Sequence, residues 1–142
     1  MHAQRLIDSY RRCTGKELFP VDGERPLAEQ LYEAPVVVLS HGTEADPVLN
    51  YGNRTALELW EMDEASFTKM PSRYTAEPME REARERFMAA VRANGYVDDY
   101  TGIRISSTGR RFQIQRATVW NVVDERGERI GQAAAFSGYE YV

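Results

Sequence analysis

The sequence predicts an α+β fold, in which a five-stranded antiparallel sheet carries helices on one face and an N-terminal helical cap. Two short strands rich in β-branched residues come early and are followed by stretches with helical apolar periodicity. From Tyr96 onwards the apolar period changes to two, and turns at 107–110 and 124–127 divide the rest into a three-stranded meander. Strands, then helices, then a meander are typical of an α+β domain.

The first 35 residues are expected to form a helical segment that precedes a main domain at 36–142. Residues 2–12 fit one amphipathic helix, whose apolar stripe has three members: Leu6, Ile7 and Tyr10. Pro26 can open a second short helix. Pro35 ends that helix, because a residue that precedes proline avoids helical backbone angles.

Two strands are predicted next, at 36–40 and 47–51. Asn53 is a good N-cap for a helix over 54–62, and 63–70 predicts another short helix. Residues 71–77 are predicted to be irregular.

The clearest helix is predicted at 78–94, with proline in its first turn and Gly95 just past its end. Its expected buried stripe repeats every four residues: Met79, Ala83, Phe87 and Val91. The meander strands are predicted at 96–106, 111–123 and 129–137.

Composition and charge exclude several classes of function. The chain has 142 residues, 18 basic and 22 acidic, so its net charge is −4, and direct nucleic-acid binding is not expected. A single cysteine, Cys13, excludes an internal disulfide and a cysteine-built zinc site. The first twenty residues contain no apolar signal-peptide core, and the longest aliphatic run, 36–39, is far too short to cross a bilayer. We therefore expect a cytoplasmic protein without membrane contact.

Three phrases of the sequence, at 39–44, 50–53 and 102–112, resemble the MEKHLA family, a PAS-related group. The resemblance covers most of 26–137 and implies a PAS-like fold that senses a ligand or signal, with no known reaction. Plant relatives carry this domain at the end of homeodomain leucine-zipper proteins, whereas this chain looks like the short free-standing bacterial members. It lacks the asparagine-cysteine flavin-adduct motif of light-sensing PAS domains, and Cys13 lies outside the PAS-like region.

Aromatic and methionine side chains come from both predicted layers, and PAS domains bind ligands between such layers. This favours a pocket for a small, flat, apolar ligand, although a solid core explains the same residues equally well. The candidate ligand-binding residues are Tyr51, Asn53, Trp60, Phe67, Met70, Tyr74, Phe87, Tyr100, Trp120 and Phe136. The cavity itself is predicted to be bounded by six of these: Tyr51, Trp60, Phe67, Tyr74, Phe87 and Trp120.

No catalysis is expected, and the identity of any cofactor is left open. The alternative is a small cone-shaped enzyme, an isomerase or hydrolase, that uses Asp98, Tyr100 or His41. If the strand is regular, Asp98 and Tyr100 share a face. His41 with Glu44 and Asp46 is a weak metal pattern, and we predict that His41 holds no metal or haem.

A stripe of small residues, Gly131, Ala133 and Ala135, lies on one face of the last meander strand. We expect the N-terminal segment to pack on this stripe, or on the same stripe of a partner in a two-fold homodimer. The chain carries no recognisable effector, so output is expected to pass through a protein partner. A further alternative is a pure dimerisation module with a filled core.

Overall fold

A computed structural model of the chain describes residues 2–76 and 78–142, apart from the side chains of 78–81 and 84. It forms one antiparallel sheet in the order β2-β1-β5-β4-β3, and β6 also pairs with β4. In chain order the elements are α1 (His2–Thr14), α2 (Leu27–Glu33), β1 (Val37–His41), β2 (Leu49–Gly52), α3 (Arg54–Trp60), α4 (Glu64–Phe67), the 3-10 helix η1 (Ser72–Thr75), α5 (Pro78–Asn94), β3 (Tyr96–Ile105), β4 (Arg111–Val123), β5 (Arg129–Phe136) and β6 (Gly138–Tyr141).

The predicted α+β fold and its meander are confirmed, with a sixth strand that the sequence did not predict. The predicted strand at 129–137 ends at Phe136, and after Ser137 the chain continues as β6. β5 pairs with the second half of β4 and β6 with its first half, where Phe112 lies opposite Tyr141. The two strands therefore run one after the other along the same edge of β4.

Asn53 joins three elements at the start of α3. Its side-chain oxygen accepts from the backbone N–H groups of Ala56 and Val38, each at 3.1 Å. Its amide nitrogen donates to the carbonyls of Leu31 at 3.2 Å and Val36 at 2.7 Å. Asn53 is fully buried, so this one side chain caps α3 and also fixes the end of α2 and the start of β1.

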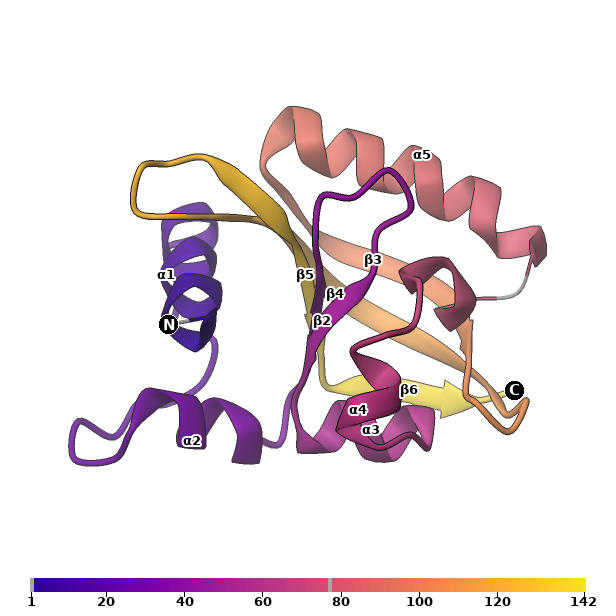
Figure 1. The fold of residues 1–142 in the computed structure, drawn as a ribbon, viewed down its shortest axis with the longest axis horizontal. Helices are drawn as coiled ribbons and strands as arrows, with labels where there is room; N and C mark the ends of the chain where they lie inside the picture. Colours follow the sequence, from indigo (N-terminus) through magenta and orange to yellow (C-terminus); the bar gives the residue numbers. More distant parts are fainter. Residues whose placement is uncertain (1, 77) are drawn as a thin grey trace.

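The helices divide between the two faces of the sheet (Figure 1). α1 and α2 lie on one face, which we call the cap face. The predicted N-terminal cap is confirmed there, because Leu6 and Ile7 share a buried apolar cluster with Ala133 and Ala135. α3, α4, η1 and α5 lie on the other face, which we call the cavity face.

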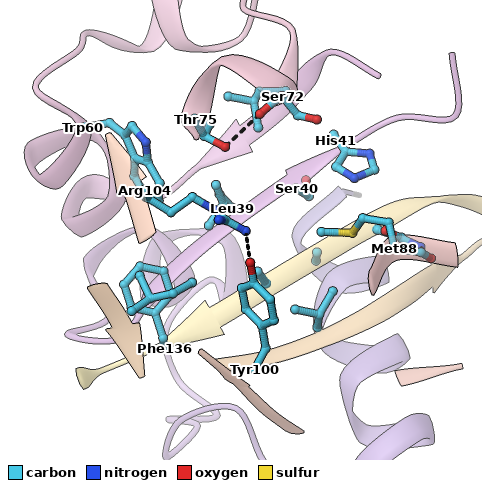
Figure 2. Close-up of a pocket in the computed structure, with 16 residues that line it drawn as sticks. Leu39, Ser40, His41, Trp60, Ser72, Thr75, Met88, Tyr100, Arg104 and Phe136 are labelled. Carbon is cyan, nitrogen blue, oxygen red and sulfur yellow. Dashed lines mark hydrogen bonds between the residues drawn. The ribbon is translucent and has the colours of Figure 1, made fainter. Parts of the chain in front are cut away.

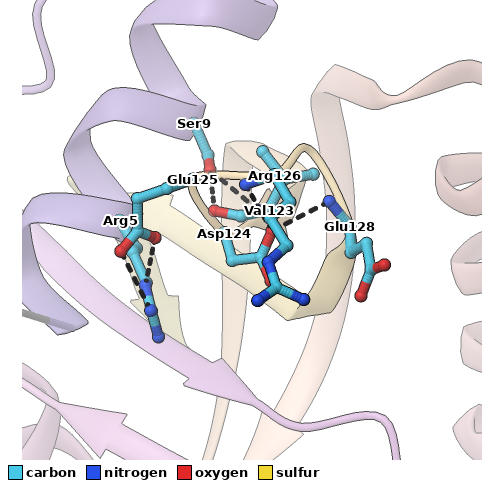
Figure 3. Close-up of polar contacts among 7 residues, drawn as sticks. All are labelled: Arg5, Ser9, Val123, Asp124, Glu125, Arg126 and Glu128. Carbon is cyan, nitrogen blue, oxygen red and sulfur yellow. Dashed lines mark hydrogen bonds and ion pairs between the residues drawn. The ribbon is translucent and has the colours of Figure 1, made fainter.

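Polar contacts fasten α1 to the turn between β4 and β5 (Figure 3). Arg5 donates to both carboxylate oxygens of Glu125, at 2.8 and 3.1 Å. The hydroxyl oxygen of Ser9 accepts from the Val123 N–H at 3.0 Å, and Asp124 accepts from the backbone within its own turn. The cap is therefore fixed by apolar burial and by directed hydrogen bonds.

The buried stripe predicted for α5 needs one correction. Val91 is fully buried and Phe87 is half-buried, but Ala83 is exposed. The side chain of Met79 lies outside the described residues. Only the C-terminal half of the stripe is thus observed to pack, where α5 lies over β3 and β4.

Candidate functional site

A cavity of about 40 Å³ lies on the cavity face, between the sheet and the helical layer of α3, η1 and α5 (Figure 2). Space of this kind holds a water molecule from about 10–15 Å³ upwards, so the cavity can take a few water molecules or a very small ligand. Apolar side chains make most of its wall, with Leu39 from β1, Ile114 from β4 and Met88 from α5.

Of the residues predicted to bind a ligand, Trp60, Tyr100 and Phe136 line this cavity. Trp60 reaches it from the end of α3 and packs edge-on against Phe136, with ring centroids 6.3 Å apart. Phe67 and Met70 belong to the surrounding apolar core and do not line the cavity. Phe87 packs directly on Tyr100, with ring centroids 4.1 Å apart.

The predicted cavity boundary is wrong for five of its six residues, because Tyr51, Phe67, Tyr74, Phe87 and Trp120 do not line the cavity. Tyr51 and Trp120 pack instead in the apolar cluster of the cap face. Trp120 is fully buried there, and its indole N–H donates to the Leu6 carbonyl at 3.2 Å. Burial raises the pKa of the Tyr51 phenol. Alternation places Trp120 on the other side of β4 from its neighbour Val119, which lines the cavity.

The two other predicted residues also lie elsewhere. Asn53 does not line the cavity, and its side-chain atoms are engaged in the cap of α3. Tyr74 is 44% exposed and its ring stacks under the Arg73 guanidinium, 4.4 Å from its carbon. Whether any of the ten residues binds a ligand stays a prediction.

Two cavity-lining side chains carry a polar atom that no described residue satisfies. One is the indole N–H of Trp60, and the other is the side-chain oxygen of Gln132 on β5; each residue is 1% exposed. The amide nitrogen of Gln132 donates to the Met88 carbonyl at 3.1 Å and to the Asn121 oxygen at 3.3 Å. Both partners are acceptors, so rotating the Gln132 amide by 180° would place its oxygen against two other oxygens. The amide orientation is therefore fixed, and the unpartnered atom is the oxygen, an acceptor.

Arg104 adds a positive charge to the same wall. It comes from β3, is 5% exposed and donates to the Tyr100 hydroxyl at 2.7 Å and to the Ile103 carbonyl at 2.9 Å. Figure 2 shows its side chain between Trp60 and Tyr100. Gly102 makes this possible, since a Cβ there would lie 2.4 Å from the Tyr100 hydroxyl.

Sequence reasoning missed Gln132 and Arg104, although each left a signal. Gln132 interrupts a run of small apolar residues in β5, on the same face as Phe136. Arg104 lies two residues beyond Gly102, so the two residues share one face of β3.

The residues of the enzyme alternative do not converge. His41 and Tyr100 line the cavity, but Asp98 is exposed. β3 is irregular between Val97 and Tyr100, so the regular alternation that would place Asp98 beside Tyr100 is broken. His41 lies at the cavity wall, with Nδ1 2.8 Å from the Gly42 carbonyl oxygen. Among the described residues, no group of three or more His, Cys, Asp and Glu side chains could hold a metal ion.

A wider groove adjoins the cavity and shares His41, Met88 and Gln132 with it. We call it the outer groove. The charged side chains along it have both signs: Glu44, Asp46, Arg73, Glu85, Arg92 and Arg129. Arg73 pairs with Asp46 at 3.1 Å.

Within the described part of the chain, no helix is long and apolar enough to span a bilayer.

Comparison with solved structures gives PAS and light-oxygen-voltage folds. A PAS domain from Colwellia psychrerythraea aligns with a TM-score of 0.66 at 13% identity, over 81% of this chain and 92% of that one. The light-state dimer of the fungal blue-light photoreceptor Vivid aligns with a TM-score of 0.65 at 18% identity, over 93% of this chain and 90% of that one. At these identities the likeness establishes the fold.

Two curated relatives come from Arabidopsis thaliana. The homeobox-leucine zipper protein ATHB-9 is 32% identical over 126 residues, which is 84% of this chain and 15% of that protein. ATHB-14 is 27% identical over 139 residues, which is 94% of this chain and 16% of that protein. The chain thus spans about one sixth of the length of these relatives. The family model of the MEKHLA domain matches residues 1–141, so the chain belongs to the MEKHLA family.

Proposed function

We propose that this PAS-like domain is a sensory or binding module that holds one small ligand in the cavity between its sheet and α3, η1 and α5. The observation that carries the proposal is the pair of unpartnered polar atoms on the cavity wall, on Trp60 and Gln132. Buried polar groups in folded proteins nearly always have a partner, so two unpartnered atoms on side chains that line one cavity favour an occupant that supplies the missing partners.

The side chains that line the cavity indicate the chemistry of the ligand. Trp60, Phe136 and Tyr100 supply flat aromatic surface, as a flat apolar ligand needs. Arg104 and Gln132 supply polar atoms, which a purely apolar ligand would leave unsatisfied. The ligand that fits this wall best is therefore small, with apolar and polar parts.

Native mass spectrometry of the protein as purified tests the proposal. We expect a folded species heavier than the bare chain by one small molecule, which is released on denaturation. Trp60→Phe keeps most of the ring and removes the orphan N–H, so its occupancy should fall. Trp120→Phe is the matched control, because its indole lies on the cap face, and its folded fraction should keep the ligand. A bare chain in every sample would contradict the proposal.

A second candidate function, contact with a second copy or another protein, is favoured by β6. All four of its residues are exposed, and Tyr139 and Tyr141 present aromatic rings there. Sedimentation of the wild type beside Tyr141→Ser tests this candidate. We expect a wild-type dimer that the substitution weakens, and a wild-type monomer at high concentration would contradict it.

A further inference from the structure

Arg104 is a buried cation whose charge the described residues do not neutralise. It is 5% exposed, and no described carboxylate forms an ion pair with it. Arginine is almost never buried to this degree without a paired anion, because its charge loses hydration. Its protein partners, the Tyr100 hydroxyl and the Ile103 carbonyl, are both neutral.

The position of Arg104 is built by its neighbours on β3. Tyr100 folds back over Gly102, where a Cβ would lie 2.4 Å from its hydroxyl, and accepts from Arg104 at 2.7 Å. Phe87 packs against the Tyr100 ring, with centroids 4.1 Å apart. The guanidinium carbon lies 5.1 Å from the centroid of the Tyr100 ring. A guanidinium has five N–H donors, so these two hydrogen bonds leave donors for a further acceptor.

Charges farther out do not supply the missing anion. The described charged groups of the outer groove are three arginines and three carboxylates, so their formal charges cancel. Arg73 already pairs with Asp46. Arg129 lies close enough to Arg92 for the two charges to repel, and burial together with this repulsion lowers the Arg129 pKa. The two carboxylates of the outer groove that remain, Glu44 and Glu85, do not line the cavity and form no described ion pair with Arg104.

Gln132 sets a second requirement on the same occupant. Its unpartnered oxygen belongs to a side chain that lines the cavity of about 40 Å³, which Arg104 also lines, and a buried acceptor needs a donor. The Trp60 N–H also has no described partner, and a buried donor needs an acceptor. An apolar cation would be repelled by Arg104, and a simple hydrocarbon would satisfy neither Gln132 nor Trp60.

We propose that the cavity binds a small hydroxycarboxylate, whose carboxylate pairs with Arg104 and whose hydroxyl group donates to the Gln132 side-chain oxygen. This assignment rests on the proposed ligand-binding function and names its chemical class. A carboxylate matches the planar guanidinium fork and would replace the lost hydration of the buried charge. The small volume limits the carbon skeleton to a few atoms.

Thermal unfolding of the intact chain, titrated with named probes, tests the assignment. The probes are glycolate, L-lactate and D-lactate, their neutral amides, and inorganic phosphate. We expect at least one hydroxycarboxylate to raise the midpoint of unfolding, and its amide and phosphate to have little effect. In Arg104→Met this response should be lost. Arg126→Met is the matched control, because Arg126 lies in the exposed turn between β4 and β5, and its response should equal that of the wild type.

Stability of the ligand-free variants separates binding from folding. Removing an uncompensated buried charge and keeping its volume is often neutral or stabilising, so Arg104→Met should unfold no earlier than the wild type without probe. If Arg104→Met does not fold, Arg104→Lys keeps the charge and loses the fork, and should bind the hydroxycarboxylate about tenfold or more weakly.

Each other outcome overturns the assignment. An amide that binds as well as its acid, or an acid response that survives in Arg104→Met, would reject the carboxylate and leave ligand binding in place. A response to phosphate alone would reject the carboxylate in favour of another oxyanion. No response to any probe would also reject it, and native mass spectrometry of the purified protein would then decide the proposed function separately.

Discussion

The two faces of the sheet each bury a tryptophan, and the two differ in one hydrogen bond. Trp120 on the cap face donates its indole N–H to the Leu6 carbonyl. Trp60 on the cavity face is buried to the same degree, and its N–H has no partner among the described residues. The Tyr51 hydroxyl on the cap face also has no partner among the described residues, but it belongs to a packed apolar cluster, whereas Trp60 and Gln132 both line the cavity. The cavity face therefore differs in combining unpartnered polar side chains with a space that an occupant can fill.

Deletion of residues 1–25 gives the largest expected effect, because it uncovers the whole cap face. Leu6 and Ile7 are almost fully buried against the sheet, and each contributes about 1.5–3 kcal/mol by burial. The Trp120 indole also loses its acceptor. We expect an aggregated or larger species in sizing chromatography and no cooperative unfolding. A soluble protein of unchanged apparent mass per chain, with a cooperative transition, would contradict the role of the cap.

Substitution of two glycines tests backbone packing in the sheet against side-chain packing beside the cavity. A Cβ on Gly131 would lie 2.1 Å from the His41 backbone oxygen, in the pairing of β1 with β5, and the backbone would have to shift. We expect Gly131→Ala to destabilise the protein by about 3 kcal/mol. In Gly102→Ala the clash is with the movable Tyr100 side chain, so the loss should be smaller. Denaturant unfolding of both variants is the measurement, and equal losses would count against this explanation.

The tryptophans themselves give the next effect. Trp120→Phe leaves the buried Leu6 carbonyl without its donor, whereas Trp60→Phe removes an N–H that has no described partner. We therefore expect Trp120→Phe to destabilise the ligand-free, refolded protein by about 1–3 kcal/mol more than Trp60→Phe. If denaturant unfolding gives the two variants the same stability, the difference in hydrogen bonding between the two tryptophans makes no difference to the free energy of unfolding.

The smallest effects concern one exposed carboxylate on each side. Hydroxyls of Thr108 and Ser106 lower the pKa of Glu61 at the end of α3, and Arg5 lowers the pKa of Glu125 beside the cap. A carboxyl whose pKa is lower in the folded state stabilises the fold above its unfolded-state pKa. That contribution disappears as the pH falls through the folded-state pKa.

Unfolding midpoints of Glu61→Gln and Glu125→Gln, measured from neutral to acidic pH, check this. Each variant should be less stable than the wild type at neutral pH, and the difference should vanish in acid. High salt should shrink the Glu125 difference more, because Arg5–Glu125 is an exposed ion pair and Glu61 is held mainly by hydroxyls. The same salt response for both variants would contradict the assigned causes.

The fold was largely predictable because each element has its own local signal. Asn53 marked the start of α3, and the turn after Val123 marked the hairpin of β4 and β5. β6 was missed because only Ser137 separates it from β5, and its pairing with β4 is long-range. Strand periodicity predicts that side chains alternate between the two faces of the sheet, but it does not predict which helix covers each face.

The candidate site was predictable only in part, for the same reason. Aromatic content located Trp60, Tyr100 and Phe136, but it also selected Trp120 and Tyr51, whose alternation places them on the cap face. Nothing local distinguishes these cases, because both faces are buried. The unpartnered polar atoms of the cavity-lining side chains could not be predicted from the sequence. An atom lacks a partner only when the packed structure brings no donor or acceptor to it.

A crystal structure of the protein as purified tests the central claim most directly. We expect density for a small non-protein molecule between the sheet and α3, with atoms at hydrogen-bonding distance from the Trp60 indole nitrogen and the Gln132 side-chain oxygen. Side chains that close the cavity and bond to these two atoms, or density for ordered water alone, would contradict it.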